Sequence, residues 1–142
     1  MRTLPVTPVV PARLAFPAGP APVSEGIAFT RRALTTWFPR TKSAAVADIV
    51  LVAAELLANA AQHADGPLAL DLRTTPSGRI RIAVTDASAA VPKVRSPMPH
   101  TPGGHGMRIV DHLARAWGTH PAAGGKTVWA ECDPPPTTIP AL

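Results

Sequence analysis

Two segments of the chain, 68–73 and 79–86, alternate apolar and polar residues with a period of two. This period predicts half-buried strands, and the turn-forming residues Thr75–Gly78 between them predict a hairpin. The residues expected to face the core are Leu68, Leu70, Leu72, Ile80, Ile82 and Val84. A further strand is predicted over Thr127–Cys132, and a short edge strand over Arg13–Pro17, where the nearby prolines favour a sheet edge.

Three other segments place apolar residues at helical spacing and are predicted to be helices. The first covers 24–38, with Ser24 as its N-cap. The second covers 43–64. The third covers 106–117, with Gly118 as its C-terminal stop. The residues of the first helix expected to share an apolar face are Ile27, Leu34 and Phe38.

Together these elements predict an α+β fold, a two-layer α/β sandwich in which helices cover one face of a mainly antiparallel sheet. The 18 prolines of the 142-residue chain lie mostly in the first 22 residues, in the 92–102 segment and after residue 133. Such composition is typical of extended segments without a core of their own. We therefore expect a Pro-rich N-terminal arm (1–22) that includes the edge strand, a folded domain (23–133) and a Pro-rich C-terminal tail (134–142).

The formal net charge of +5 does not by itself indicate a nucleic-acid-binding protein. The basic residues are scattered, and only Arg31 and Arg32 are adjacent. No aromatic residues are interleaved with them, as a base-stacking surface would require. An attraction to anionic ligands or acidic partner surfaces fits the charge better, and no direct contact with nucleic acid is expected.

The single cysteine, Cys132, excludes a disulfide framework and a cysteine-rich zinc site, and its place near a strand end predicts a buried structural thiol. The prolines that interrupt the N-terminal segment argue against a signal peptide. The most apolar stretch, Val46–Ala61, contains Asp48, Glu55 and Asn59, so no membrane span is expected. These features predict a cytoplasmic protein.

The second predicted helix has few polar residues, and three of them, Glu55, Asn59 and His63, are four apart and therefore share a face. Asp48 lies two turns before Glu55 on the same side. One interpretation is a partly exposed polar face. The other is the wall of a site, because a carboxamide oxygen suits Mg²⁺ and a carboxylate one turn earlier suits a role near a γ-phosphate.

Asp86 ends a predicted strand on its core side, where an unpaired charge is costly. It is either an acceptor for an amino group such as that of adenine, or a turn-starting residue bonded to nearby backbone N–H groups. Gly103–Met107 places three glycines directly before the third helix, which lets a backbone approach a ligand and offers N–H groups to phosphates. This segment is neither a Walker loop nor a dinucleotide-binding fingerprint.

Taken together and in this order, the motifs resemble the histidine kinase-like ATPase family over roughly residues 24–133. The family's Glu-x-x-x-Asn helix motif, Asp-x-Gly-x-Gly-Ile-Pro box, Gly-x-Gly lid box and Gly-x-Thr strand motif have counterparts in Glu55–Asn59, Asp86–Pro92, Gly104–Gly106 and Gly125–Thr127. The continuation of the helix motif to His63 resembles the anti-sigma-factor serine kinases. Both glycines of the Asp box are replaced, by Ser88 and Ala90.

This resemblance implies a Bergerat-type ATP-binding fold and a role for each matching residue. Asn59 would coordinate Mg²⁺ on bound ATP, Glu55 would be the general base, and Asp86 would receive the adenine amino group. The other residues implied to contact the nucleotide are His63, Thr127 at the adenine end, and Gly104, Gly106 and Met107 around the phosphates. The 91–102 segment would be a short ATP lid.

The resemblance further implies a regulatory protein with serine/threonine protein kinase activity, which sequesters a sigma factor and phosphorylates an anti-anti-sigma partner. The length of the chain favours this expectation, because it leaves no room for the sensor and phosphoacceptor regions of a sensor histidine kinase. The analogy also allows for a homodimer. Two alternatives stay open: a non-catalytic or weakly nucleotide-binding interaction module, suggested by the replaced glycines, and a structural domain in which the motifs are coincidental.

Overall fold

The computed structural model describes residues 2–3, 10–16, 23–39, 44–64, 66–90, 106–136 and 138–139. The first residue of the predicted 43–64 helix, Gly104 and the predicted lid at 91–102 lie outside these residues. The elements are, in chain order, β1 (Arg2–Thr3), β2 (Ala12–Ala15), α1 (Val23–Trp37), α2 (Ala44–His63), β3 (Pro67–Thr74), β4 (Ile80–Asp86), α3 (Gly106–Leu113), β5 (Ala116–Ala122), β6 (Gly125–Cys132) and β7 (Thr138–Ile139).

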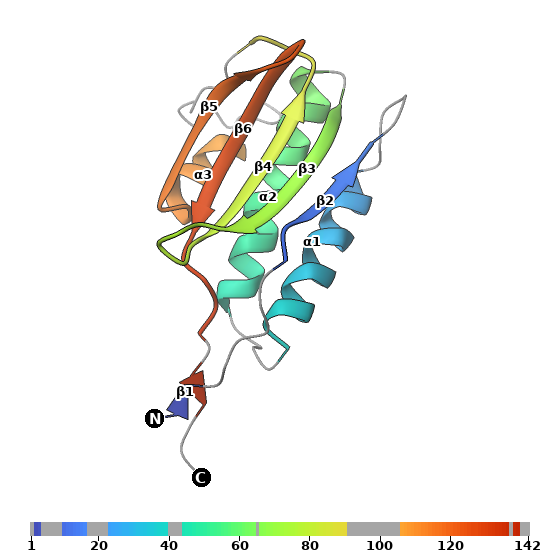
Figure 1. Cartoon of the computed structure of the whole chain (residues 1–142). Helices are drawn as coiled ribbons and strands as arrows, with labels where there is room; N and C mark the ends of the chain where they lie inside the picture. Colours follow the sequence, from blue (N-terminus) through green and yellow to red (C-terminus); the bar gives the residue numbers. More distant parts are fainter. Residues whose placement is uncertain are drawn as a thin grey trace.

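Five strands form an antiparallel sheet in the order β2-β3-β4-β6-β5, and α1, α2 and α3 cover one of its faces (Figure 1). This arrangement confirms the predicted α+β two-layer sandwich, and β2 confirms the predicted edge strand. β1 and β7 pair with each other in a separate two-residue ladder. That ladder was not predicted, because both of its strands fall in the segments expected to be Pro-rich arms.

The core lies between the helices and the inner face of the sheet. The alternation predicted for β4 is confirmed, because Ile80, Ile82 and Val84 are all buried. In β3 the prediction for Leu68 was wrong: it is 46% exposed, whereas Leu70 is buried. A bulge between Pro67 and Ala69 shifts the pairing register at this point, so Leu68 is out of phase with the rest of the strand.

α2 is the central helix of the core and packs against α1, α3 and the sheet. Its side chains that are no more than 1% exposed are Ile49, Val52, Ala53, Leu56, Leu57 and Ala60. By length and composition alone, Ala44–Gln62 is also able to cross a membrane. In this fold its apolar face is occupied by the other elements, which is the ordinary reason for so apolar a helix in a folded domain.

α1 begins at Val23, so Ser24 lies within its first turn and is not the N-cap that was predicted. The predicted apolar face is confirmed, because Leu34 and Phe38 are buried and Ile27 is half-buried against the core. The buried residues of the helix are Gly26, Thr30, Leu34 and Trp37. A Cβ added to Gly26 would lie 2.5 Å from a methyl group of Leu57, so the glycine lets α1 and α2 approach closely.

α3 ends at Leu113, and its predicted continuation to Trp117 was wrong because Ala116 and Trp117 already belong to β5. Trp117 nevertheless lies beside the helix, since its indole N–H donates to Asp111 Oδ1 at 2.9 Å. Gly118, predicted to stop the helix, lies inside β5 opposite Trp129, where a Cβ would come within 3.0 Å of the indole. β5 was not predicted, because it is an edge strand with little apolar alternation. Its first two residues also fit the helical spacing of the segment before them.

Candidate functional site

Asp86, the last residue of β4, is 1% exposed and points into the protein with the apolar residues that precede it in the strand. Its Oδ1 atom accepts a hydrogen bond from the backbone N–H of Ser88 at 2.9 Å. Its Oδ2 atom is buried and has no hydrogen-bond partner among the described residues. A buried acceptor left unpaired costs about 1–3 kcal/mol, so Oδ2 is an acceptor that favours the arrival of a donor.

Asp86 is therefore compatible with both interpretations, as a turn-starting residue through Oδ1 and as an acceptor for an amino group through Oδ2. Oδ1 takes part in the turn after β4, as a turn-starting aspartate does. Oδ2 keeps the property required of the expected adenine contact, because it can accept from an exocyclic amino group without breaking any bond within the described residues.

Lys126 on β6 is directly opposite Asp86 in the sheet and is 4% exposed. Its ammonium group donates to Asp86 Oδ1 at 3.0 Å and to the backbone oxygen of Ser88 at 3.2 Å. The buried carboxylate is thus paired with a cation, as a charge in the interior requires. The two charges and the turn form one hydrogen-bonded unit.

The turn that follows Asp86 is held in part by the side chain of Ser88, at a position where the family pattern has a glycine. Ser88 Oγ accepts from the backbone N–H of Ala90 at 3.1 Å, and the Ser88 carbonyl accepts from Lys126. The neighbouring strand comes so close that a Cβ on Gly125 would collide with the backbone oxygen of Asp86. Glycine is therefore required at position 125 to let β6 approach the turn.

Glu55 and Asn59 of α2 are half-buried and separated by about 6 Å along the helix axis. Leu57 faces Gly26 of α1, and a helix turns about 100° per residue, so Asn59 points to the side of α2 away from α1. α3 flanks α2 on that side (Figure 1). The predicted polar pair therefore lies along the junction of α2 and α3.

The carboxyl end of α2 and the end of β4 lie at the same end of the molecule (Figure 1). The chain connects them, because Pro67, three residues after Ala64, pairs with Asp86 across the β3–β4 ladder. Asn59 is consequently at the same end as Asp86. Asp48 lies near the other end of the helix and away from Asp86. Its charge raises the pKa of Cys132, which pairs with Ile80, the first residue of β4.

Burial raises the pKa of the Glu55 carboxyl above its ordinary value, because desolvation disfavours the charged form. A carboxylate with a raised pKa is a stronger base, which is the property expected of a group that takes a proton near neutral pH. No group of three His, Cys, Asp or Glu side chains that could hold a metal ion forms within the described residues. A metal ion here would depend on Asn59 together with ligand oxygens and water, which is the usual coordination of Mg²⁺ at a nucleotide.

Two residues predicted from the glycine-rich segment, Gly106 and Met107, lie at the start of α3. Gly106 is its first residue, and Met107, 6% exposed, packs in the core cluster with α2 and the sheet. Gly104 lies outside the described residues, and so does the side chain of His63, the last residue of α2.

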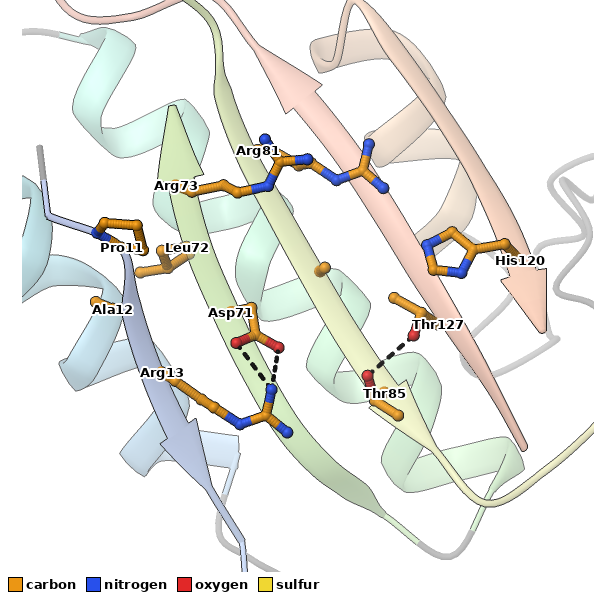
Figure 2. Close-up of a pocket in the computed structure, with 11 residues that line it drawn as sticks. Pro11, Ala12, Arg13, Asp71, Leu72, Arg73, Arg81, Thr85, His120 and Thr127 are labelled. Carbon is orange, nitrogen blue, oxygen red and sulfur yellow. Dashed lines mark hydrogen bonds and ion pairs between the residues drawn. The ribbon is translucent and has the colours of Figure 1, made fainter. Parts of the chain in front are cut away.

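The structure does not bring Thr127 to Asp86. Thr127 follows Lys126 in β6, so it points to the opposite face of the sheet, where its hydroxyl bonds that of Thr85 at 3.0 Å. Figure 2 shows this pair on the face away from the helices, beside His120. A shallow cavity of about 460 Å³ lies there, and Asp71 and Arg13 form an ion pair at its edge.

Lys126 was not predicted as a site residue, because the Gly-x-Thr motif leaves its middle position undefined. A signal was present in the sequence: Val128, Ala130 and Cys132 alternate toward the core, and the same period carries back to position 126. A lysine at an inward position of a central strand requires a buried acid, and Asp86 ends the neighbouring strand.

A scan against protein-family models matches the histidine kinase-like ATPase domain over residues 16–131, and a search of curated proteins gave no match. The matched range begins directly after β2 and includes α1, α2, α3 and β3 to β6, apart from the last residue of β6. The helices on one face of an antiparallel sheet, and the buried acceptor at the end of β4, agree with it. The chain therefore belongs to the histidine kinase-like ATPase family and is an ATP-binding domain of that family.

Proposed function

We propose that this protein is a regulatory serine/threonine protein kinase of the anti-sigma type, which sequesters a sigma factor and phosphorylates a serine of an anti-anti-sigma partner. The observation that supports its nucleotide-binding part best is the buried Oδ2 of Asp86, which has no donor within the described residues. The kinase part is supported by the helix motif from Glu55 to His63, whose first two polar residues line the α2–α3 junction.

Each residue of this arrangement has a separate task. Asp86 binds the adenine amino group through Oδ2, and Asn59 ligates Mg²⁺ through its side-chain oxygen. Bound Mg-ATP supplies the phosphoryl group that is transferred. Glu55 accepts the proton that the serine hydroxyl loses as its oxygen bonds to phosphorus, while ADP departs with the electrons of the broken P–O bond.

The test uses ATP labelled in its γ-phosphate, Mg²⁺ and purified candidate antagonist proteins, with phosphoserine identified by mass spectrometry. Glu55→Gln keeps the size of the side chain and removes its basicity. We expect this variant to bind ATP as the wild type does and to transfer phosphate about a hundredfold more slowly or worse. Equal transfer by Glu55→Gln and the wild type would remove Glu55 from the mechanism.

Asn59→Ala is the matched variant for the metal. Calorimetric titration with ATP, with and without Mg²⁺, should show that Mg²⁺ strengthens binding to the wild type and has little effect on Asn59→Ala. The same dependence on Mg²⁺ in both proteins would contradict the proposed role of Asn59.

One observation favours a second function, a nucleotide-binding interaction module without catalysis. The turn after Asp86 has Ser88 and Ala90 where the family pattern has two glycines, and hydrogen bonds to Ser88 and from Lys126 close it. Under this function the protein binds its partner whether or not Glu55 is intact, and no serine is labelled. Partner binding that is insensitive to Glu55→Gln, together with the absence of phosphoserine, would favour the module over the kinase.

A further inference from the structure

The buried ion pair at the end of the sheet offers more than one contact to a ligand. The ammonium group of Lys126 has three N–H donors. Two are used, by Asp86 Oδ1 and by the Ser88 carbonyl. Among the described residues, the third N–H has no acceptor, just as Asp86 Oδ2 has no donor. Within the described part of the chain, an unused donor and an unused acceptor therefore lie on two side chains that are bonded to each other.

Both side chains are held in place, so this pattern is fixed by the fold. The side chains of Lys126 and Asp86 are 6% and 0% exposed. Their backbones are directly paired in the β4–β6 ladder, and Gly125 allows β6 to contact the turn after Asp86. A long lysine side chain ordinarily loses much rotamer freedom on binding a ligand, but here that cost is met on folding.

An acceptor next to a donor is complementary to the N1–C6 edge of adenine and not to that of guanine. Adenine carries an amino group at C6, a donor, beside N1, an acceptor. Guanine carries an oxygen at C6 beside an N–H at N1, so the order of donor and acceptor is reversed. A base whose C6 group meets Asp86 Oδ2 therefore makes two hydrogen bonds if it is adenine and two unfavourable contacts if it is guanine.

We propose that Lys126 is a base-recognition residue, which donates a hydrogen bond to N1 of adenine while Asp86 accepts from the amino group. The inference rests on the proposed binding of ATP at this end of the sheet. It assigns nucleotide specificity to the pair, and not to Asp86 alone.

The test compares nucleotide analogues on the wild-type protein by calorimetric titration. In 1-deaza-ATP a C–H group replaces N1, and in 7-deaza-ATP a C–H group replaces N7, which the proposal does not use. We expect 1-deaza-ATP to bind about ten to a hundred times more weakly than ATP, because a hydrogen bond to a charged donor is lost. 7-Deaza-ATP is the control for loss of a ring nitrogen. GTP should bind about a thousandfold more weakly than ATP, or worse.

Lys126→Met removes the donor while keeping an unbranched side chain. In this variant ATP and 1-deaza-ATP should bind with equal affinity, whereas the ratio between ATP and 7-deaza-ATP should stay as in the wild type. Because Lys126→Met leaves Asp86 without its counter-ion, the double variant Asp86→Asn, Lys126→Met is measured as well. It is neutral, keeps an acceptor for the amino group and should also bind ATP and 1-deaza-ATP equally.

The outcomes separate the two proposals. If the wild type binds ATP but shows no preference over 1-deaza-ATP, the inference about Lys126 is wrong and the proposed function stands. A preference that persists in the double variant likewise overturns it, since another group must then contact N1. If the wild type binds no ATP, both proposals fail.

Discussion

At the residue scale, the environment of an ionisable group decides what that group can do. Asp86 and Cys132 are both buried on the inner face of the sheet, at opposite ends of the β4–β6 pair. Asp86 has a cation beside it and an oxygen that no donor among the described residues reaches. Around Cys132 the charges are negative: burial, with the charges of Asp133 and Asp48, raises the pKa of its thiol to about 11. The first residue is suited to bind a ligand and the second is suited to fill space.

Cys132 should therefore be chemically inert in the folded protein. The thiolate is the reactive form, and a pKa of about 11 leaves very little of it at pH 8. We expect alkylation by iodoacetamide at pH 8 to be at least about a hundredfold slower in the native protein than in urea, because both ionisation and access are reduced. Equal rates would show that the thiol is exposed.

The raised pKa also fixes the sign of a pH effect on stability. The unfolded thiol ionises near its ordinary value and the folded thiol does so only near pH 11, so the folded state binds more protons in between. Stability is then lost as the pH rises above about 9. Cys132→Ala should unfold with a shallower dependence on pH between about 9 and 11 than the wild type, as measured by urea denaturation.

Gly125 should be far less tolerant of a side chain than its neighbour Gly124. An alanine at 125 would drive its Cβ into the backbone oxygen of Asp86, so β6 or the turn would have to move. Gly124 has φ 75° and nothing within 4 Å of an added Cβ, so an alanine there costs only about 1–2 kcal/mol of backbone strain. In urea denaturation Gly125→Ala should lose clearly more free energy of unfolding than Gly124→Ala. The reverse order would mean that the turn moves easily.

At the scale of elements, the bulge in β3 separates two leucines that a simple alternation would treat alike. Leu68→Ala and Leu70→Ala remove the same atoms. We expect the first to cost less than about 1 kcal/mol, because Leu68 is 46% exposed, and the second to cost about 2–5 kcal/mol, because Leu70 is fully buried. Chemical denaturation of the two variants checks this. Similar losses would place Leu68 in the core, as its spacing alone indicates.

The sequence predicted elements well where one physical pattern dominates. β4 alternates cleanly and α2 is long, so both were placed closely, and Glu55, Asn59 and Asp86 were located on them. β5 was missed because it is an edge strand with one neighbour and little need to alternate. Lys126 was missed because its role depends on the register between β4 and β6, which are 40 residues apart at the ion pair. Register of this kind is set by tertiary pairing.

At the scale of the whole molecule, the two faces of the sheet have different chemistry. The inner face carries the core and ends at the Asp86–Lys126 pair. The outer face carries charged side chains that are largely paired, including Arg81, which contacts Glu131 at 3.2 Å and lies 4.5 Å from the centre of the Trp129 ring. A ligand bound at the inner end should consequently couple to the stability of the entire fold.

ATP should therefore raise the resistance of the protein to unfolding. At a free ATP concentration a hundred times the dissociation constant, binding to the folded state alone adds about 2.7 kcal/mol to the free energy of unfolding. Thermal denaturation with and without Mg-ATP measures this shift. The shift should be lost in Asp86→Ala, which removes the acceptor for the amino group, and a shift of equal size in that variant would place the nucleotide elsewhere.

The central part of the sheet consists of two hairpins, β3–β4 and β5–β6, joined along β4 and β6. Asp86 belongs to the first hairpin, and its counter-ion Lys126 belongs to the second. During synthesis, which proceeds from the N-terminus, the carboxylate emerges 40 residues before the ammonium group that neutralises it. The first hairpin can pair early, but its last residue has a settled position only after β6 has been made. The nucleotide end is thus the part of the sheet that a nascent chain completes late, and a chain stopped short of β6 has the acceptor without the charge that holds it.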